Sequence, residues 1–243
     1  MGDSINEQEI LKRIRVELST RADLELRESQ KRYFKEAMES YGIKTAEVQR
    51  MAKAVLKELK QAKASKDEIF ELCEELWKSG MQEEMHIACA FSESQVKLYE
   101  PSDFETFGRW IKTYVSNWAS CDTLCNHTVG DLIAKFPELS ESLIPWTESD
   151  NRWVRRAAAV TLIVPAKRGG FLPLVFRIAD ALLTDTDDMV QKGYGWLLKE
   201  TAESHEDEVF AYIMAHKAEM PRTALRYAIE KMPQERRQMA MAK

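Results

Sequence analysis

The apolar residues of this chain recur with the period of an α-helix almost from end to end. Residues 48–59 show the pattern clearly, with apolar side chains at Val48, Met51, Ala52, Val55, Leu56 and Leu59. Side chains three and four positions apart share one face of a helix. No stretch alternates apolar and polar residues for long enough to indicate a sheet. We therefore expect an all-α fold.

Helix starts and stops divide this pattern into short segments. Ser65 and Glu68 have the spacing of a capping box, and Thr45, Ser149 and Asp187 are candidate N-caps for three further helices. Glycines and prolines follow many of the apolar runs, at Gly42, Gly80, Gly169, Gly170, Pro145, Pro165, Pro221 and Pro233. About a dozen short amphipathic helices without a low-complexity linker predict a single domain over residues 1–243, an α-solenoid of stacked antiparallel helix pairs.

The composition is that of an ordinary soluble globular chain. Of the 243 residues, 44% are hydrophobic and 31% charged. No apolar run approaches the roughly 18 residues of a membrane span, and the first residues, MGDSINEQEILKRI, lack the pattern of a signal peptide. We expect a cytoplasmic protein with no membrane partner. Its four cysteines form no CxxC pair and are expected to be reduced thiols.

Residues 116–127 place a carboxylate beside an indole. On a helix over 118–136 the apolar face holds Cys121, Leu124, Cys125, Val129 and Leu132. Trp118 and Asp122 are i, i+4 neighbours at the rim of that face. A carboxylate there is costly unless it is paired or exposed in a cleft, so Asp122 departs from plain core packing. The alternative is a first-turn Asp that the helix dipole favours, and the spacing leaves both open.

Residues 151–160 carry three arginines on one helix. Arg152, Arg155 and Arg156 cluster opposite the apolar face, and Asp150 is the only acid within three residues of any of them. Guanidinium forks suit phosphate oxygens, and the neighbouring alanines leave room for a phosphate backbone. The alternative is a solvated charged face with intrahelical ion pairs.

Residues 189–199 combine two glycines with a tryptophan between lysines. Gly193 and Gly195 each cost about 1 kcal/mol relative to Ala inside a helix, so we expect a close neighbour to need the space. Trp196 has Lys192 one turn before it and Lys199 one turn after it. Such an indole is either a stacking platform for nucleic acid or a core residue with snorkelling lysines.

The net charge of −5 is unevenly distributed. Residues 1–149 hold 20 basic and 27 acidic side chains, whereas residues 150–243 hold 15 and 13. An acidic chain does not bind nucleic acid by bulk charge, but a local basic face is compatible with modest, salt-sensitive binding.

Several catalytic motifs do not occur in the sequence. It has no GxxxxGK[ST] or GxGxxG loop, no HExxH and no GxSxG. Cys121, Cys125 and His127 are close in sequence, but their spacing fits no standard zinc site. We expect neither a metal ion nor an organic cofactor.

Taken together, these segments resemble the AlkD-like DNA alkylation repair family of DNA glycosylases, which are built from HEAT-like helical repeats. The resemblance covers most of the chain in order and spacing. Its motifs are Tyr41 to Thr45, Leu76 to Ser79 with Glu83 and Glu84, the Trp118 and Asp122 segment, Trp153 to Ala158, and Gln191 to Glu200.

The resemblance implies a HEAT-like repeat DNA glycosylase domain with a concave DNA-binding face and the family's site residues. At the matching positions, the catalytic set is Asp122, Trp118 and Trp196. The arginine that contacts phosphate falls on Arg156, with Arg155 next to it. The family's further contacts to the DNA backbone fall on Lys44, Thr45 and Lys199, and its aromatic residue near the lesion strand falls on Tyr33. Arg152 and Lys192 join the DNA-binding set through their positions on the basic faces.

The implied activity is excision of positively charged N3- and N7-alkylated purines from duplex DNA, without a metal and by a monomer. The family also contains inactive members, so a non-catalytic binder of damaged or branched DNA is a second hypothesis. A third is an α-solenoid whose concave face binds a peptide or protein. A nucleoid-associated location in the cytoplasm is expected for either DNA hypothesis.

Overall fold

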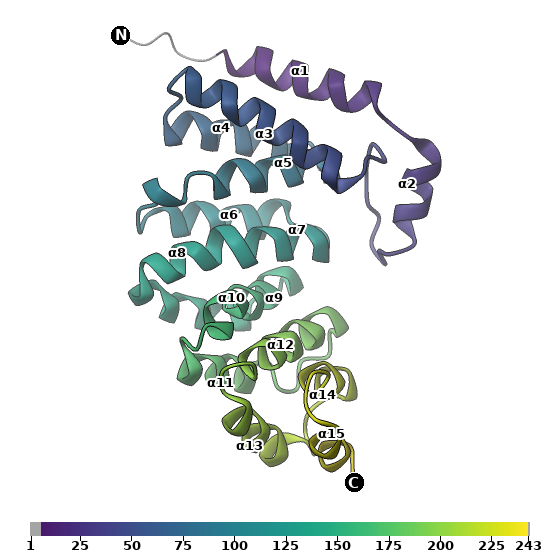
Figure 1. Ribbon diagram of the computed structural model, residues 1–243, viewed down its shortest axis with the longest axis vertical. Helices are drawn as coiled ribbons and strands as arrows, with labels where there is room; N and C mark the ends of the chain where they lie inside the picture. The colour runs from purple at the N-terminus through teal and green to yellow at the C-terminus, as the bar shows by residue number, and fades with distance from the viewer. Residues whose placement is uncertain (1–5, 243) are drawn as a thin grey trace. The chain divides into compact units, whose positions relative to one another are not determined.

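The computed structural model describes residues 6–242, which are organised in helices joined by short turns (Figure 1). Within this range the only β-interaction outside the helices is an isolated parallel bridge between Glu39 and Met81. The expected all-α fold is therefore confirmed. Residues 1–5 of the polar N-terminal segment and Lys243 lie outside the described residues.

The chain divides into two compact units, which we describe separately. The first comprises residues 1–99 and 113–123. Its described helices are α1 (Glu7–Thr20), α2 (Leu24–Lys31), α3 (Thr45–Gln61), α4 (Lys66–Lys78), α5 (Gln82–Glu93), the 3-10 turn η1 (Val96–Leu98) and α7 (Trp118–Thr123). Helix α5 is the centre of this unit, because α3, α4 and α7 all pack against it (Figure 1). Its core includes Leu72, Leu76, Trp77, Met85 and Phe91.

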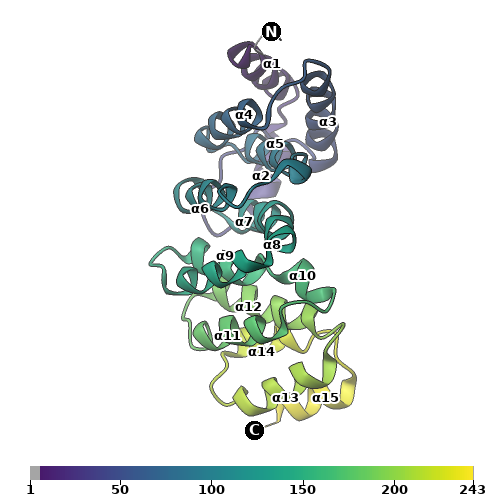
Figure 2. The same ribbon diagram turned by 90° about the vertical axis from the view of Figure 1, so that its left-hand side faces the viewer.

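The second unit comprises residues 100–112 and 124–243. It contains most of α6 (Asp103–Tyr114), the π-helical turn η2 (Leu124–Val129), α8 (Gly130–Lys135), the 3-10 segment η3 (Pro137–Glu148), α9 (Arg152–Val160), α10 (Ile163–Lys167), α11 (Leu172–Ala181), α12 (Asp188–Thr201), α13 (Glu206–His216), α14 (Arg222–Ala228) and α15 (Gln234–Met241). Helix α12 packs against α9, α10, α11 and α14 and forms the centre of this unit (Figure 2).

The N-caps agree with the sequence at two of the four predicted positions. Ser65 and Glu68 form the predicted capping box, and Asp187 accepts from the backbone N–H groups of Met189 and Val190 at 2.9 and 3.3 Å. The prediction for Ser149 is wrong, because Asn151 caps α9 instead. Lys44 occupies the N-cap of α3 without a side-chain bond, and Thr45 is the first residue of that helix.

The predicted helix over 118–136 is present with one change of geometry. Residues 118–135 run through α7, η2 and α8, and the middle part is a π-helical turn. At Gly130 an added Cβ would lie 2.9 Å from the carbonyl oxygen of Thr161, so this close approach requires glycine. Such π turns inside α-helices are frequent at functional sites, and this one begins two residues after Asp122.

Candidate functional site

Helix α7 begins at Trp118 and carries Asp122 one turn later. Its start is fixed by Asn117, which is buried and accepts from the N–H of Ser120 at 3.0 Å. The amide of Asn117 also donates to the side chain of Gln82 on α5 at 2.8 Å. Trp118 and Asp122 are both partly exposed, whereas Ser120 and Cys121 are buried. Both side chains therefore lie at the rim of the helix, as their spacing predicted.

The segment after α2 holds the Trp118 indole on two sides. The Phe34 ring stacks on it with centroids 5.3 Å apart and planes at 16°. The indole Nε1–H donates to the carbonyl oxygen of Tyr33 at 3.3 Å. The Tyr33 side chain itself is 75% exposed. One indole face and the N–H are thus occupied by protein, which leaves the other face as the surface that Trp118 can offer to a ligand.

The loop before α3 is held by a buried carboxylate on α5. Glu83 is 2% exposed and accepts hydrogen bonds from the Ser40 hydroxyl and from the N–H groups of Tyr41, Gly42 and Ile43, at 2.8 to 3.0 Å. A buried charge with four donors is well compensated, so this loop has a defined path. It leads directly into Lys44 and Thr45, which are both exposed.

The neighbouring carboxylate, Glu84, holds the same loop through a side chain. It accepts from the Tyr41 hydroxyl at 2.9 Å and from Arg15 Nε at 3.1 Å. Burial and this bond to Glu84 raise the pKa of Tyr41 to about 12. Tyr41 therefore stays a neutral donor at physiological pH.

Trp196 on α12 is positioned by Glu200 one turn later. The indole Nε1–H lies 3.3 Å from Glu200 Oε1, and the carboxylate also accepts from Lys231 and Lys167 at 2.8 and 2.9 Å. Burial alone would raise the pKa of Glu200, but the bonds from Lys231 and Lys167 outweigh it and lower that pKa to about 2. Glu200 is thus ionised under all ordinary conditions and orients a partly exposed indole.

The two glycines of α12 are explained by close packing, as expected. A Cβ on Gly195 would lie 2.7 Å from the carbonyl oxygen of Ala224 and 2.8 Å from Tyr227 Cβ, so α14 approaches α12 along this line. A Cβ on Gly193 would lie 3.2 Å from Arg156 Cγ. Space on α12 is therefore needed by another helix and by a buried arginine.

The arginine cluster of α9 is not the open cationic surface that the sequence suggested. Arg155 pairs with Asp185 at 2.7 Å, and Arg152 pairs with Asp187 at 3.2 Å. Both aspartates lie some 30 residues later in the chain, in the turn before α12. The residues around α9, where Asp150 is the nearby acid, give no indication of these two ion pairs.

The prediction that Arg156 lies on an open face of α9 is also wrong. It is 5% exposed, and its Nη1 donates to the carbonyl oxygen of Met189. Its stem packs at Gly193, so it joins α9 to α12 from the inside. The neighbouring Ala159 is also buried rather than open to a phosphate backbone.

The predicted DNA-binding lysines of α12 are also paired. Lys192 lies 3.4 Å from Asp188 on the same helix. Lys199 reaches Glu230 at 3.0 Å, and its Nζ lies 5.7 Å from the centroid of the Tyr227 ring. Lys199 therefore spans from α12 to the segment after α14.

The predicted residues fall into two groups, one in each unit. Trp118 and Asp122 belong to the first unit with Tyr33, Lys44 and Thr45. Trp196 belongs to the second unit with the predicted arginines and lysines of α9 and α12. A common site for Asp122 and Trp196 stays a prediction.

Three positioning residues escaped the sequence reasoning. Phe34 lies in a polar segment without helical periodicity, and its only signal is its adjacency to Tyr33. Glu83 and Glu200 belong to motifs that carry the family resemblance. Nothing in their spacing indicated that each is a buried carboxylate that accepts several hydrogen bonds.

Within residues 6–242 no group of three or more His, Cys, Asp or Glu side chains is arranged to hold a metal ion. All four cysteines are free and buried. None of the helices in the described part has the length and apolar character needed to cross a bilayer.

Comparison with known proteins relates this chain to DNA alkylation repair enzymes. A solved structure of a predicted DNA alkylation repair enzyme from Enterococcus faecalis is similar with a TM-score of 0.78, over 88% of this chain and 97% of that chain. At 18% sequence identity this likeness concerns the fold. Residues 14–232 match the model of a family described as DNA alkylation repair enzyme, and the chain therefore belongs to that family. No curated protein matches the chain.

Proposed function

We propose that this protein is a monofunctional DNA glycosylase that excises cationic N3- and N7-alkylated purines from duplex DNA. The observation that carries the proposal is the pairing of a partly exposed carboxylate, Asp122, with an indole one turn away that Phe34 and Tyr33 hold in place. Membership of the DNA alkylation repair enzyme family supports alkylated DNA as the substrate.

The proposed reaction is hydrolysis of the N-glycosidic bond. Alkylation gives the purine a formal positive charge, so the base leaves with the bonding electron pair and becomes neutral without protonation by an enzyme acid. Water adds to C1′ of the deoxyribose and loses a proton, which leaves an abasic site. Asp122 stabilises the positive charge that develops on the sugar, and it orients or deprotonates the water.

Two indoles assist this carboxylate in the proposal. The open face of Trp118 contacts the sugar of the lesion and excludes water, which strengthens the field of Asp122. Trp196, oriented by Glu200, plays the same part from the second unit. Lys44, Thr45 and Tyr33 contact the backbone near the lesion, and Lys192 and Lys199 bind phosphates in exchange for their acidic partners.

The arginines have a different part in this proposal from that suggested by sequence alone. Arg152 and Arg155 are partly exposed and can exchange Asp187 and Asp185 for phosphate oxygens. Arg156 is enclosed between α9 and α12, so its contribution to DNA binding is to hold α9 in place. Duplex binding is therefore expected to be modest and strongly dependent on salt.

The charge of the lesion provides the test. Duplexes that contain 7-methylguanine or 3-methyladenine should release the free base, whereas a duplex with the neutral lesion hypoxanthine should not, because no enzyme acid protonates it. Base release is measured by chromatography. Binding of all three duplexes without release would favour the non-catalytic DNA binder, and failure to bind DNA at low salt would remove both DNA functions.

A further inference from the structure

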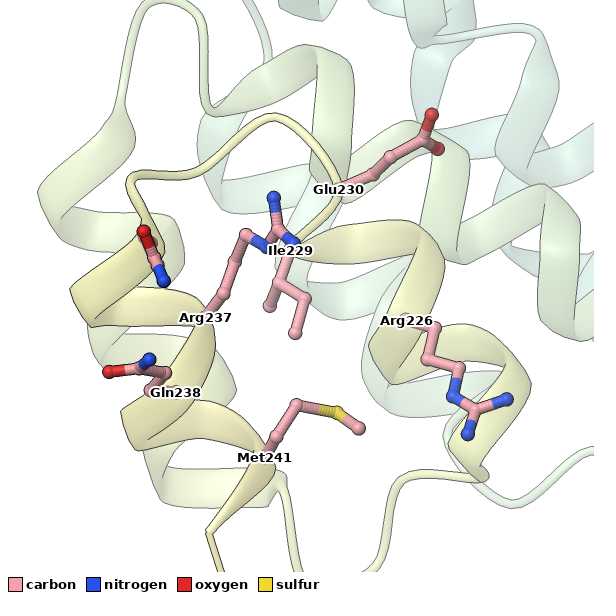
Figure 3. A pocket seen from close by; sticks show the side chains of 7 residues that line it. Arg226, Ile229, Glu230, Arg237, Gln238 and Met241 are labelled. Atoms are coloured by element: carbon pink, nitrogen blue, oxygen red, sulfur yellow. The ribbon is translucent and has the colours of Figure 1, made fainter.

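A pocket of about 410 Å³ lies between α14 and α15, apart from the residues assigned to the repair site (Figure 3). Its lining residues come from these two helices and the turn that joins them, and include Arg226, Ile229, Gln234, Arg237, Gln238 and Met241. Ile229 and Met241 lie between the two arginines in Figure 3. The pocket thus has an apolar middle with a guanidinium group at each edge.

The charge of this pocket is not compensated by its acidic residue. Glu230 also lines the pocket, but its carboxylate is bonded to Lys199 at 3.0 Å and points away in Figure 3. Among residues 6–242 neither the Arg226 nor the Arg237 side chain has a hydrogen-bond or ion-pair partner. The neighbouring Arg236, by contrast, is bonded to both Glu206 and Asp207. Two positive charges are therefore free at one pocket, whereas the arginines of α9 are neutralised or enclosed.

We propose that this pocket binds a phosphate group. Guanidinium forks match phosphate oxygens in geometry, and the amides of Gln234 and Gln238 offer further donors beside them. The apolar side chains of Ile229 and Met241 reduce the exposure of the bound anion to water, which strengthens its attraction to both arginines. The volume admits a phosphate together with part of a sugar.

The phosphate belongs to the backbone of duplex DNA, and this assignment of its source rests on the proposed function. Lys199 lies three residues after Trp196 on α12 and reaches across to Glu230 at the pocket. Helix α14 packs directly on α12, so the pocket lies next to the predicted contact between Lys199 and the DNA backbone. The same chemistry would suit free phosphate or a phosphorylated small molecule, and the experiment separates these sources.

The test compares arginines on the same pair of helices. Arg226→Gln and Arg237→Gln each remove one charge from the pocket. Arg222→Gln removes an exposed charge from α14 outside the lining and is the matched control. The affinity of each variant for an undamaged duplex is measured over a range of salt concentrations. Each pocket variant should lower the salt slope by about 0.9, and the control should leave it unchanged.

A second measurement follows the Nε–Hε signals of Arg226 and Arg237 by NMR during titration with inorganic phosphate. Saturable shifts with an unchanged duplex slope would support the pocket and assign it to a free phosphate compound. Equal slopes for all three variants without saturable shifts would overturn the proposal. Base release is not part of either measurement, so loss of the glycosylase proposal would leave the pocket standing, and the converse also holds.

Discussion

Arg155 donates to Asp185 from Nε at 2.7 Å and from Nη2 at 3.4 Å, across about 30 residues of sequence. Its Nη1 also donates to the carbonyl oxygen of Ser149 at 2.8 Å. Together with the pair of Arg152 and Asp187, this arrangement satisfies the basic side of α9 within the protein. Phosphate oxygens that approach α9 must replace carboxylates, which reduces the gain from each contact.

The ion pair of Arg155 and Asp185 should contribute measurably to stability. Asp185→Asn leaves the mostly buried Arg155 without its anionic partner, and we expect it to lower the free energy of unfolding by about 2 kcal/mol. Asp188→Asn removes the partly exposed partner of Lys192 and should cost less than about 1 kcal/mol. Urea denaturation measures both, and equal losses would show that the Arg155 pair is a surface pair in solution.

The approach of α14 to α12 predicts outcomes of different size at the two helix glycines. Gly195→Ala sets a Cβ against the backbone of Ala224, so we expect a net loss of about 1 to 2 kcal/mol despite the better helix propensity. At Gly193 the nearest atom is a side-chain atom, Arg156 Cγ at 3.2 Å, rather than backbone at 2.7 Å, so Gly193→Ala should cost less than Gly195→Ala. Thermal unfolding compares them. A neutral Gly195→Ala would mean that the two helices are not in close contact.

The ionised state of Glu200 predicts that the folded protein loses stability over a defined acidic range of pH. Its pKa is about 2 in the folded protein against an ordinary value of 4.5, so its contribution is complete above pH 4.5 and is lost as the pH falls towards 2. Because Lys167 and Lys231 are half exposed, we expect about 2 kcal/mol rather than the full amount.

Glu200→Gln should therefore flatten the stability profile between pH 4.5 and 2 while it keeps an acceptor for Trp196. Glu203→Gln removes an exposed carboxylate that contacts the same two lysines and should flatten the profile less. Denaturant unfolding at a series of pH values measures both profiles. If Glu200→Gln lost as much stability between pH 4.5 and 2 as the wild type, the low pKa of Glu200 would be contradicted.

The stacking of Phe34 on Trp118 predicts an effect on catalysis. Phe34→Ala uncovers the second face of the indole, so the proposed contact with the lesion sugar loses its fixed geometry and single-turnover excision should fall roughly 10- to 100-fold. Phe70→Ala, which truncates a half-buried ring on α4, is the control and should excise at the wild-type rate. Similar rates for both variants would show that Phe34 does not position Trp118 for catalysis.

The helices were predictable from sequence because their signals are local. The apolar period places α3 and α4, and the Ser65 and Glu68 pair marks the start of α4. The position of Trp118 and Asp122 on one helix rim is equally local. The pairing of Arg155 with Asp185, and the burial of Arg156 under α12, depend on which helices meet. A single sequence carries no direct signal for such contacts, so the charge of α9 was overestimated.

The most direct test of the proposed function is the single-turnover release of 7-methylguanine from a duplex by wild type and by Asp122→Asn. The amide keeps the shape of the carboxylate but removes the charge that stabilises the sugar cation, so the rate should fall about 100- to 1000-fold with duplex affinity unchanged. Asp131→Asn, on the following helix α8, is the control and should release the base at the wild-type rate. Equal release by wild type and Asp122→Asn would contradict the assignment of Asp122 as the catalytic carboxylate.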